Sequence, residues 1–584
     1  MALRNDATIQ PTTSAPAAAG AEAEIGHPPG STVREAGLPG RHSLWRQAIA
    51  TARSWHFMLV LAAGAVTALI LLVPLYLLIR GFGAGEEAVA TLFSLRTLGV
   101  LGNTLLLAVA VTFGATVLAI PLAWLTTATD LPGRRLWGVL VALPLILPSY
   151  VVAFIHVSLL SPKGLFQQLL EPVIGIDRLP NFYGFPGAFL VLTLITYPYI
   201  LLTVRVAIKR LDPSLIEASR SLGLSPWQTF WRVILPHLRP AVLAGALLVI
   251  LYVLRDFGAV TTLQFNTFTR IIYNRYLSYQ LDMAALFAAV LVLCTTAILF
   301  LEQRSRGRAR YNRLSAGSPR QLRPTHLGKW KAPALVFTGF VVVVALGLPV
   351  VTLLYWLWRG WQGQGTMAQI GAMGNNLASL GDLLEPAWFT ASASLAAALL
   401  TILLALPIAI LAVRRPGRLS RLFERVAYAG YALPGIVVAL AFVFFGIQAV
   451  PSLYQTLPML LAAYIILFLP QAIGAERASL LQVSPALEEA GRSLGRNPLA
   501  VLRQVTLPLI RPGLVGGALL VFLTAMKELP ATLLLSPLGF NTLASQVWTN
   551  IGEAFFARAA LPTLLLLLLS SVPLAWLTLR DGHK

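Results

Sequence analysis

Charged residues and cysteines are scarce in this chain. Of its 584 residues, 11% are charged and 57% are hydrophobic, whereas soluble domains carry about 25% charged residues. This composition excludes an ordinary soluble domain and indicates a polytopic membrane protein. Cys294 is the only cysteine. The chain therefore has neither an internal disulfide nor a cysteine cluster, and its cysteine content says nothing about its compartment.

Motifs for ATP binding and for metal chemistry are also missing. No G-x-x-x-x-G-K-[ST] motif is present, since the Gly328-Lys329 pair is followed by Trp330. Without this loop the chain has no backbone cradle for ATP phosphates, so energy must come from another polypeptide or from an ion gradient. H-E-x-x-H and C-x-x-C are absent, and the seven histidines do not stand at metal-ligand spacing. We therefore predict a non-enzymatic protein with no cofactor and no metal site.

Long apolar runs, in contrast, are abundant. Twelve are long enough for the roughly 20 residues that a helix needs to cross a bilayer. They lie at about 57–79, 98–125, 137–160, 186–207, 241–262, 283–301, 333–356, 387–413, 427–448, 455–474, 513–535 and 559–579. Basic residues concentrate between alternate runs, which by the positive-inside rule places both termini in the cytoplasm. The chain has a net charge of +21. We therefore expect its basic residues to set the topology and to contact membrane lipid, and not to bind nucleic acid.

One block of sequence occurs twice, at an offset of 272 positions. Residues 217–236 read EASRSLGLSPWQTFWRVILP, and residues 489–508 read EAGRSLGRNPLAVLRQVTLP. Each copy has a Glu-Ala pair, a glycine six residues after the Glu, and a closing Leu-Pro. These shared residues are Glu217, Ala218, Gly223 and Pro236 in the first copy, and Glu489, Ala490, Gly495 and Pro508 in the second.

Local signals predict the same structure for both copies. Asp212-Pro213 and Ser484-Pro485 each place a capping side chain before a proline at the first helical position. The shared glycine fits the left-handed position that ends a helix, and Ser225-Pro226 or Asn497-Pro498 then begins the next one. We predict a helix, a glycine turn and a second helix in a basic, water-facing loop.

Further matches extend the duplication over most of the chain. Leu147-Pro148 recurs as Leu433-Pro434 at an offset of 286, so the first half carries about fourteen extra residues in an external loop near 161–185. We predict two six-span repeats, 53–301 and 333–584. A basic tail, 1–52, precedes the first repeat, and a basic cytoplasmic linker, 302–332, joins the two. An even number of spans in each repeat makes them parallel.

The duplicated block resembles the EAA loop of the membrane subunits of ABC importers, here at 208–240 and 476–512. The resemblance implies that each loop docks on an ATP-binding subunit, of which there are two copies, and that a solute-binding protein outside delivers the substrate. It also implies the ABC importer permease fold, an all-α polytopic membrane protein with twelve transmembrane helices as two parallel six-helix repeats. Taken without its sequence matches, a helix-glycine-helix loop is also consistent with a plain amphipathic connector.

Stretches in both halves look like the fused permeases of bacterial ferric iron importers. They include LPSYVVAF at 147–154, Arg255-Asp256-Phe257-Gly258 and MKELPATLLL at 526–535. The resemblance implies an inner-membrane subunit that passes iron from an external iron-binding protein; a thiamine or other small-solute permease is the alternative. A twelve-span secondary carrier is less favoured. Its hallmark needs an Arg after Asp130, where this chain has Leu131.

Two charged pairs fall inside apolar runs. Arg255-Asp256 lies in the fifth run and Lys527-Glu528 in the eleventh, at equivalent positions. Charges at this depth are costly and usually face a partner or a cavity. We expect Arg255 to meet Glu528, and Lys527 to meet Asp256, as a gate or part of the pathway between the halves. The alternative is that the side chains snorkel to the outer interface.

Overall fold

The computed structural model describes residues 41–83, 85–162, 164–175, 178–305, 324–362 and 380–581. Contacts divide the chain into two units, Met1–Thr51 and Ala52–Lys584, and the architecture that follows is that of the second unit. The first 40 residues of the expected tail, and residues 306–323 of the expected linker, lie outside the described residues. The boundaries of both segments therefore stay predictions.

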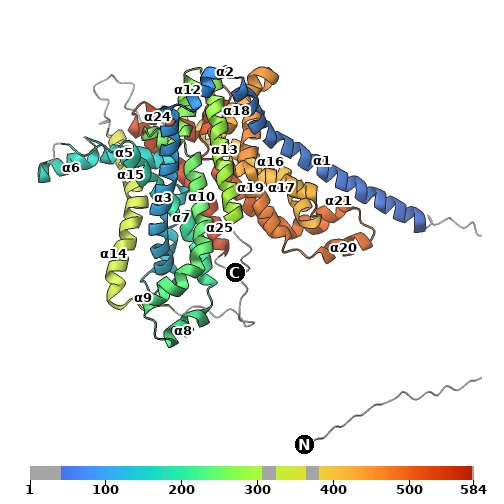
Figure 1. Ribbon diagram of the computed structural model, residues 1–584, viewed down its shortest axis with the longest axis horizontal. Helices are drawn as coiled ribbons and strands as arrows, with labels where there is room; N and C mark the ends of the chain where they lie inside the picture. The colour runs from blue at the N-terminus through green and yellow to red at the C-terminus, as the bar shows by residue number, and fades with distance from the viewer. Residues whose placement is uncertain are drawn as a thin grey trace, which may run out of the picture. The chain divides into compact units, whose positions relative to one another are not determined.

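Every named element in the described ranges is a helix (Figure 1), which confirms the all-α architecture. The first half contains α1 (Arg41–Phe82), α2 (Gly85–Leu92), α3 (Leu95–Ala128), α4 (Arg134–Leu140), α5 (Ser149–Leu160), α6 (Leu165–Ile174), α7 (Phe185–Lys209), α8 (Pro213–Ser221), α9 (Pro226–Thr229), α10 (Leu235–Arg255), α11 (Gly258–Thr262), α12 (Phe268–Leu277) and α13 (Leu281–Ser305).

The second half contains α14 (Lys331–Val342), α15 (Leu348–Trp361), α16 (Leu380–Arg414), α17 (Arg418–Ala429), α18 (Gly435–Ala449), α19 (Leu457–Leu480), α20 (Pro485–Ser493), α21 (Pro498–Val501), α22 (Leu507–Ala525), α23 (Pro530–Leu535), α24 (Leu543–Gly552) and α25 (Phe556–Asp581). Short 3-10 turns are η1 (Leu143–Ile146), η3 (Gly328–Trp330), η5 (Gly430–Ala432) and η6 (Pro451–Leu453), and π-helical segments are η2 (Phe230–Ile234), η4 (Val343–Gly347) and η7 (Leu502–Thr506).

Most of the twelve expected spans correspond to long apolar helices. Among the described residues, ten helices are long and apolar enough to cross a membrane, and an eleventh span results if one bent pair counts as a single crossing. The twelfth expected run falls in α25, whose described apolar part, Phe556–Ser571, is shorter. The described residues thus supply ten or eleven of the twelve expected spans, and the twelfth corresponds only to this shorter apolar helix.

The third and ninth expected spans are both broken at a Leu-Pro pair. Because a proline pushes the preceding residue out of the helical region, the leucine is extended, with ψ of 128° in the first half and 114° in the second. Pro148 and Pro434 then become the N-caps of α5 and α18. The two parts of the ninth span are bent by 106°. By contrast, Pro121 and Pro407 lie inside the continuous helices α3 and α16.

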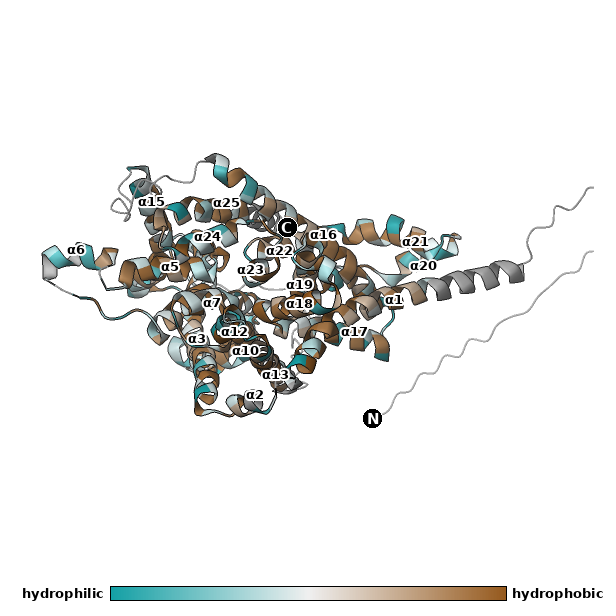
Figure 2. Ribbon diagram, turned by 90° about the horizontal axis from the view of Figure 1, so that it is seen from above, coloured by the Kyte–Doolittle hydropathy of each residue, from teal (hydrophilic) through white to brown (hydrophobic). Residues whose placement is uncertain are grey.

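Apolar side chains also cover the outside of the helices, as lipid requires. On α3, Val109, Phe113 and Val117 follow one another at intervals of four residues and are 65%, 71% and 53% exposed. Side chains at this spacing share one helix face. Figure 2 shows that hydrophobic residues also predominate along many of the other helices. Exposed apolar faces of this extent suit a membrane and not water.

The first span of each half packs against the opposite half. Residues of α1 share an apolar cluster with α18 and α19, and a Cβ added to Gly64 would lie 3.9 Å from Phe423 of α17. Residues of α14 and η4 share a cluster with α3 and α7, and a Cβ added to Gly339 would lie 3.7 Å from Trp137 of α4. The two halves therefore exchange their first helices, and neither half buries its apolar faces alone.

The chain between the halves is tied to the end of α3. Thr129 and Thr325 form an isolated parallel bridge. The Asp130 carboxylate accepts the Leu327 N–H at 2.8 Å and pairs with Lys331 at 2.9 Å. The Lys331 ammonium, followed by the Leu327 amide, holds the pKa of Asp130 below its usual range. Asp130, which was compared above with the hallmark of secondary carriers, thus anchors the connection between the halves.

Candidate functional site

The first duplicated loop has the expected helix-glycine-helix structure. The Asp212 carboxylate accepts the Ser214 N–H at 3.0 Å and begins α8. Gly223, with φ of +80°, ends it in the left-handed conformation. Ser225 and Gln228 then form a capping box that begins α9. The caps and the turn predicted from the sequence are therefore confirmed.

The second loop repeats this geometry. Ser484 caps α20 by accepting the Ala486 N–H at 3.4 Å. Gly495 also has φ of +80°, and the Asn497 side chain accepts the Ala500 N–H at 2.7 Å to begin α21. An identical φ at both glycines shows that the two loops turn in the same way.

A π-helical segment precedes the closing Leu-Pro in each loop. The Leu235 N–H donates to the carbonyl of Phe230, and the Leu507 N–H donates to that of Leu502, five residues back in each case. The proline that follows has no N–H to continue the α-helical pattern, and η4 is likewise followed by Leu348-Pro349. The sequence analysis did not predict these π-helical segments, although each of the three lies directly before a Leu-Pro pair that could have indicated it.

The outer surface of both loops combines carboxylates with large apolar side chains. Glu217 and Ala218 are exposed in the first loop, as are Glu489 and Ala490 in the second. The leucine before each shared glycine, Leu222 or Leu494, is 82% or 83% exposed, respectively. The two loops therefore expose the same kinds of residue at equivalent positions.

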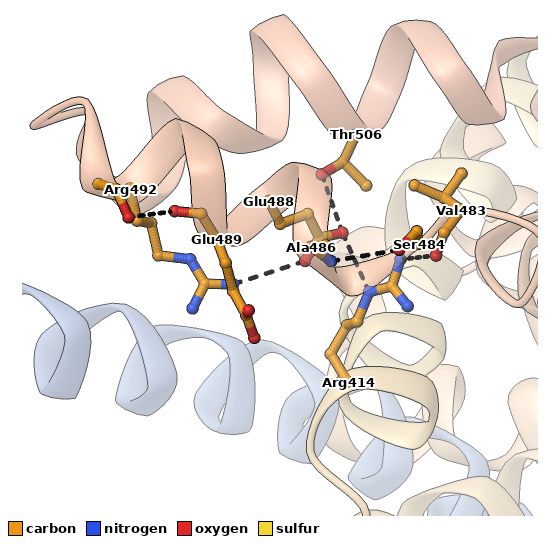
Figure 3. Close-up of polar contacts among 9 residues, drawn as sticks. Arg414, Val483, Ser484, Ala486, Glu488, Glu489, Arg492 and Thr506 are labelled. Carbon is orange, nitrogen blue, oxygen red and sulfur yellow. Dashed lines mark hydrogen bonds and ion pairs between the residues drawn. The ribbon is translucent and has the colours of Figure 1, made fainter. Parts of the chain in front are cut away.

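The interiors of the two loops differ. In the second loop the buried Glu488 carboxylate accepts the Arg414 Nε–H at 3.0 Å and the Thr506 hydroxyl at 3.2 Å, and Arg492 lies 3.6 Å away (Figure 3). Arg414 also donates to the Val483 carbonyl at 2.9 Å. This network joins α20 to the end of α16.

The first loop replaces these polar groups with apolar ones. Ile216 and Ile234 stand at the positions equivalent to Glu488 and Thr506. Its interior hydrogen bond instead joins the Ser219 and Thr229 hydroxyls at 3.1 Å. Sequence analysis did not single out Glu488. A comparison of the two copies could have found it, because the second copy has Glu488 where the first, otherwise similar copy has Ile216.

The intramembrane charges lie where helices end, not within continuous spans. The fifth and eleventh runs were expected to continue to 262 and 535, but α10 ends at Arg255 and α22 ends at Ala525. Short helices α11 and α23 follow after these breaks. The polar groups of the interrupted backbone require partners in this apolar environment. The charged side chains supply some of them.

Both cations cross to the opposite half. Arg255 Nη1 lies 3.5 Å from the carbonyl oxygen of Tyr431 in η5. Lys527 Nζ lies 3.3 Å from the carbonyl of Ile146 and 3.4 Å from that of Leu145, both in η1. Leu145 and Tyr431 occupy equivalent positions before the Leu-Pro breaks. Each half thus places a cation on the carbonyl end of the other half's broken span.

Both carboxylates remain in their own half. Asp256 Oδ2 accepts the Ala259 and Val260 N–H groups at 2.9 and 3.3 Å, at the start of α11. Glu528 Oε1 accepts the Ala531 N–H at 3.4 Å, at the start of α23. Helix N-termini attract anions because their first N–H groups lack intrahelical partners.

The direct ion pairs expected between the halves are therefore not formed among the described residues. Arg255 and Glu528 are not within ion-pair distance, and neither are Lys527 and Asp256. The physical reason is that the two broken spans supply carbonyl ends for the cations and N–H ends for the anions. Equivalence of the pairs was predicted from the sequence, but their partners were not.

Comparison of the sequence with models of known protein families shows which family has these two repeats. The family model described as "Binding-protein-dependent transport system inner membrane component" matches residues 116–306 and 401–581. The chain belongs to this family. Each match contains one duplicated loop, so the permease carries the family unit twice. The expected ABC importer permease fold is confirmed.

Relatives of the permease differ in how much of it they cover. It is 37% identical over 506 residues to the "Fe(3+)-transport system permease protein FbpB 2" of Haemophilus influenzae, covering 85% of this chain and 93% of the relative. It is 26% identical to the "Ferric transport system permease protein FbpB" of Actinobacillus pleuropneumoniae, covering 77% of this chain and 66% of the relative. The "Sulfate transport system permease protein CysT" of Escherichia coli is 29% identical but covers 31% of this chain and 65% of the relative.

Proposed function

We propose that this permease is the single-chain membrane subunit of a bacterial ABC importer that moves ferric iron across the inner membrane. The observation that carries the substrate is the similarity along most of the chain to a relative named for Fe(3+) transport. The sulfate relative, by contrast, covers about a third of the chain. Neither thiamine transport nor a secondary carrier has a comparable observation in its favour.

ATP hydrolysis takes place on separate subunits in this proposal. The permease has no P-loop, and its two loops present equivalent exposed surfaces. Two copies of one ATP-binding subunit would fit these two surfaces. Glu217 and Glu489 would make polar contacts there, and Leu222 and Leu494 would fill apolar pockets of the partner. An iron-binding protein delivers the substrate to the opposite side of the membrane.

The broken spans form the gate of the transport pathway. Arg255 and Lys527 hold the two halves together through carbonyl groups, and Asp256 and Glu528 keep the following short helices capped. When ATP brings the loops together, the halves shift and these cation-carbonyl contacts separate. A contact made in one state only can bias the equilibrium between two states.

Uptake by cells tests the substrate. A strain that lacks this chain should lose uptake of radiolabelled ferric iron and regain it when the wild-type chain is supplied. Thiamine and sulfate uptake, measured in the same cells, should not change. Loss of thiamine uptake with normal iron uptake would overturn the substrate assignment and would leave the family membership intact.

Cysteine labelling tests the orientation, in which both termini and both loops are cytoplasmic. In a Cys294→Ala background, Arg496→Cys in the second loop should react with a membrane-impermeant thiol reagent only after the cells are opened. Leu538→Cys, at a position that is 89% exposed between α23 and α24, should react in intact cells. The reverse pattern of labelling would invert the topology.

A further inference from the structure

A cavity of about 280 Å³ lies between α1 and the turn that joins α16 to α17. His56 and Val60 of α1 line one side, and Leu411 lines it from α16. The turn and the first residues of α17 form the other side. Arg414, next to this turn, is the residue that holds the second loop through Glu488. The cavity therefore lies beside the second loop, at the end of a membrane span.

Two polar side chains that line this cavity have atoms without a hydrogen-bond partner among the described residues. Ser420 is 6% exposed, and its hydroxyl has no hydrogen-bond partner among the described residues. Nδ1 of His56 is likewise buried and unpartnered in the described part of the chain. The exposed Arg415 and Arg418 also line the cavity. A serine hydroxyl, an imidazole nitrogen and two guanidinium groups form a set suited to phosphate oxygens.

The backbone adds to this set. α17 is 12 residues long, and within the described structure its N-cap, Gly417, provides no side-chain hydrogen bond to the first turn. The first N–H groups of a helix have no intrahelical acceptor and favour an anion. The nearest acid on this helix, Glu424, does not line the cavity and is paired with Arg477. The cavity is thus lined by two arginines and by the start of a helix, which favours an anion.

Apolar side chains also line the cavity. Val60, Leu411 and Phe423 line it, and Leu411 and Phe423 are buried in the surrounding apolar clusters. Leu419 and Leu422 of α17 are 48% and 53% exposed. Apolar side chains together with groups suited to phosphate, at the end of a span, match the chemistry of a phospholipid.

The equivalent corner of the first half is closed by the protein itself. Pro132-Gly133-Arg134 matches Pro416-Gly417-Arg418, but there the neighbouring Asp130 accepts the Leu327 N–H and pairs with Lys331. The chain that leads into α14 occupies this corner. In the second half α1 approaches instead and leaves the polar groups unpartnered. Among the described residues, Asp130 in the first half is thus paired with the chain that follows the linker, whereas the Ser420 hydroxyl and Nδ1 of His56, at the corner of the second half, have no hydrogen-bond partner.

We propose that this cavity binds the phosphate group of an anionic phospholipid, with part of an acyl chain against its apolar wall. The phosphate accepts hydrogen bonds from Ser420, the first turn of α17, Arg415 and Arg418. A lipid in this position bridges α1, α16 and α17 beside the loop proposed to meet the ATP-binding subunit. Free phosphate shares the headgroup chemistry but lacks the apolar part.

Lipid titration of the purified permease tests this site. In nonionic detergent, phosphatidylglycerol should raise the thermal unfolding midpoint of the wild type, whereas phosphatidylcholine and inorganic phosphate should raise it far less. The double variant Arg415→Gln with Arg418→Gln should bind phosphatidylglycerol at least tenfold more weakly, because it loses two charge-assisted contacts. Arg425→Gln is the matched control. It removes one arginine charge from an exposed position on α17 outside the cavity.

Ser420→Ala gives an independent result, since it removes one hydroxyl and should weaken lipid binding without changing the lipid-free midpoint. An equal response to phosphatidylglycerol in the double variant, Ser420→Ala and the wild type would overturn the proposal. A response to inorganic phosphate without a response to phosphatidylglycerol would overturn the lipid assignment. Native mass spectrometry of the same samples should show one retained lipid in the wild type and in Arg425→Gln, and loss of it in the double variant.

Discussion

Single residues decide how the two loops turn. Gly223 and Gly495 have φ of +80°, and a Cβ added at either position would meet nothing within 4 Å. A substitution there thus acts through the backbone and not through a clash with neighbours. This separates the glycines from their flanking residues, whose side chains form the surface of the loops.

Replacing either glycine with valine should impair coupling to ATP hydrolysis. A β-branched residue in the left-handed region costs about 1–3 kcal/mol, and the two helices of the loop would change their relative direction. Gly223→Val and Gly495→Val should lower substrate-stimulated ATPase activity of the assembled importer. Gly→Asn at the same positions is the control, because asparagine tolerates this conformation, and it should retain most activity. Equal activity in the valine and asparagine variants would contradict the role of the turn.

The interior of the second loop depends on Glu488. Removing one partner of a buried ion pair leaves the other uncompensated and costs about 3 kcal/mol or more. Glu488→Ala should therefore lower the thermal unfolding midpoint measurably, since Arg414 loses its carboxylate partner and keeps only the Val483 carbonyl among the described residues. The triple variant Glu488→Ile, Thr506→Ile and Arg414→Ala reproduces the apolar interior of the first loop and should recover most of the loss. A triple variant as unstable as Glu488→Ala would show that the network is not replaceable.

At the scale of elements, the main feature is the meeting of broken helices between the halves. Four helix breaks, at Leu147-Pro148, Leu433-Pro434 and after α10 and α22, bring free carbonyl and N–H groups together. The charges satisfy both kinds of group. A cation placed on a carbonyl end and a carboxylate placed on an N-terminus are both favourable for the helix dipole.

Variants that swap charges between the halves should distinguish these cation-carbonyl contacts from direct ion pairs. Arg255→Met should lower iron uptake about tenfold, as expected for the loss of a charge-assisted contact, and Arg255→Lys should retain part of it. Arg255→Glu combined with Glu528→Arg should not restore uptake, because the two side chains are held by different partners. Restoration by the double variant in a mutant cycle of uptake rates would instead show that the two residues pair directly during transport.

At the scale of the whole molecule, the exchanged first helices join the halves. α1 shares an apolar cluster with α18 and α19 of the second half as well as with α12 and α13 of its own, and α14 shares one with α3 and α7 of the first half. Gly64 beside Phe423 and Gly339 beside Trp137 are equivalent contacts of this exchange. A half produced alone would expose the surface that the other half's first helix covers.

Splitting the chain within the linker should test this interdependence. Fragments 1–315 and 316–584, produced together, should assemble and support iron uptake, because the cut spares both exchanged helices. Either fragment alone should accumulate poorly and be degraded. The uncut chain is the control for expression, and co-purification through a tag on one fragment measures assembly. Stable accumulation of a single fragment would contradict the packing of the first helices.

Sequence alone determined the helical composition, the duplication and the local form of both loops. Caps at Asp212 and Ser484 and left-handed turns at Gly223 and Gly495 depend on neighbours a few residues away, so their signals are readable in order along the chain. Apolar runs likewise marked most of the membrane helices. The breaks at Arg255 and Lys527 were missed, because an apolar run shows where a helix can cross and not where it ends.

Tertiary structure alone decided which groups become partners. Lys527 meets carbonyl groups nearly 400 positions earlier in the chain, and Arg414 meets Glu488 only because α16 ends beside α20. The equivalence of the charged pairs was visible in the sequence, but a buried charge takes whichever partner the packing places nearest. In this protein those partners are the ends of broken helices, and their positions follow from the packing of the two halves against each other.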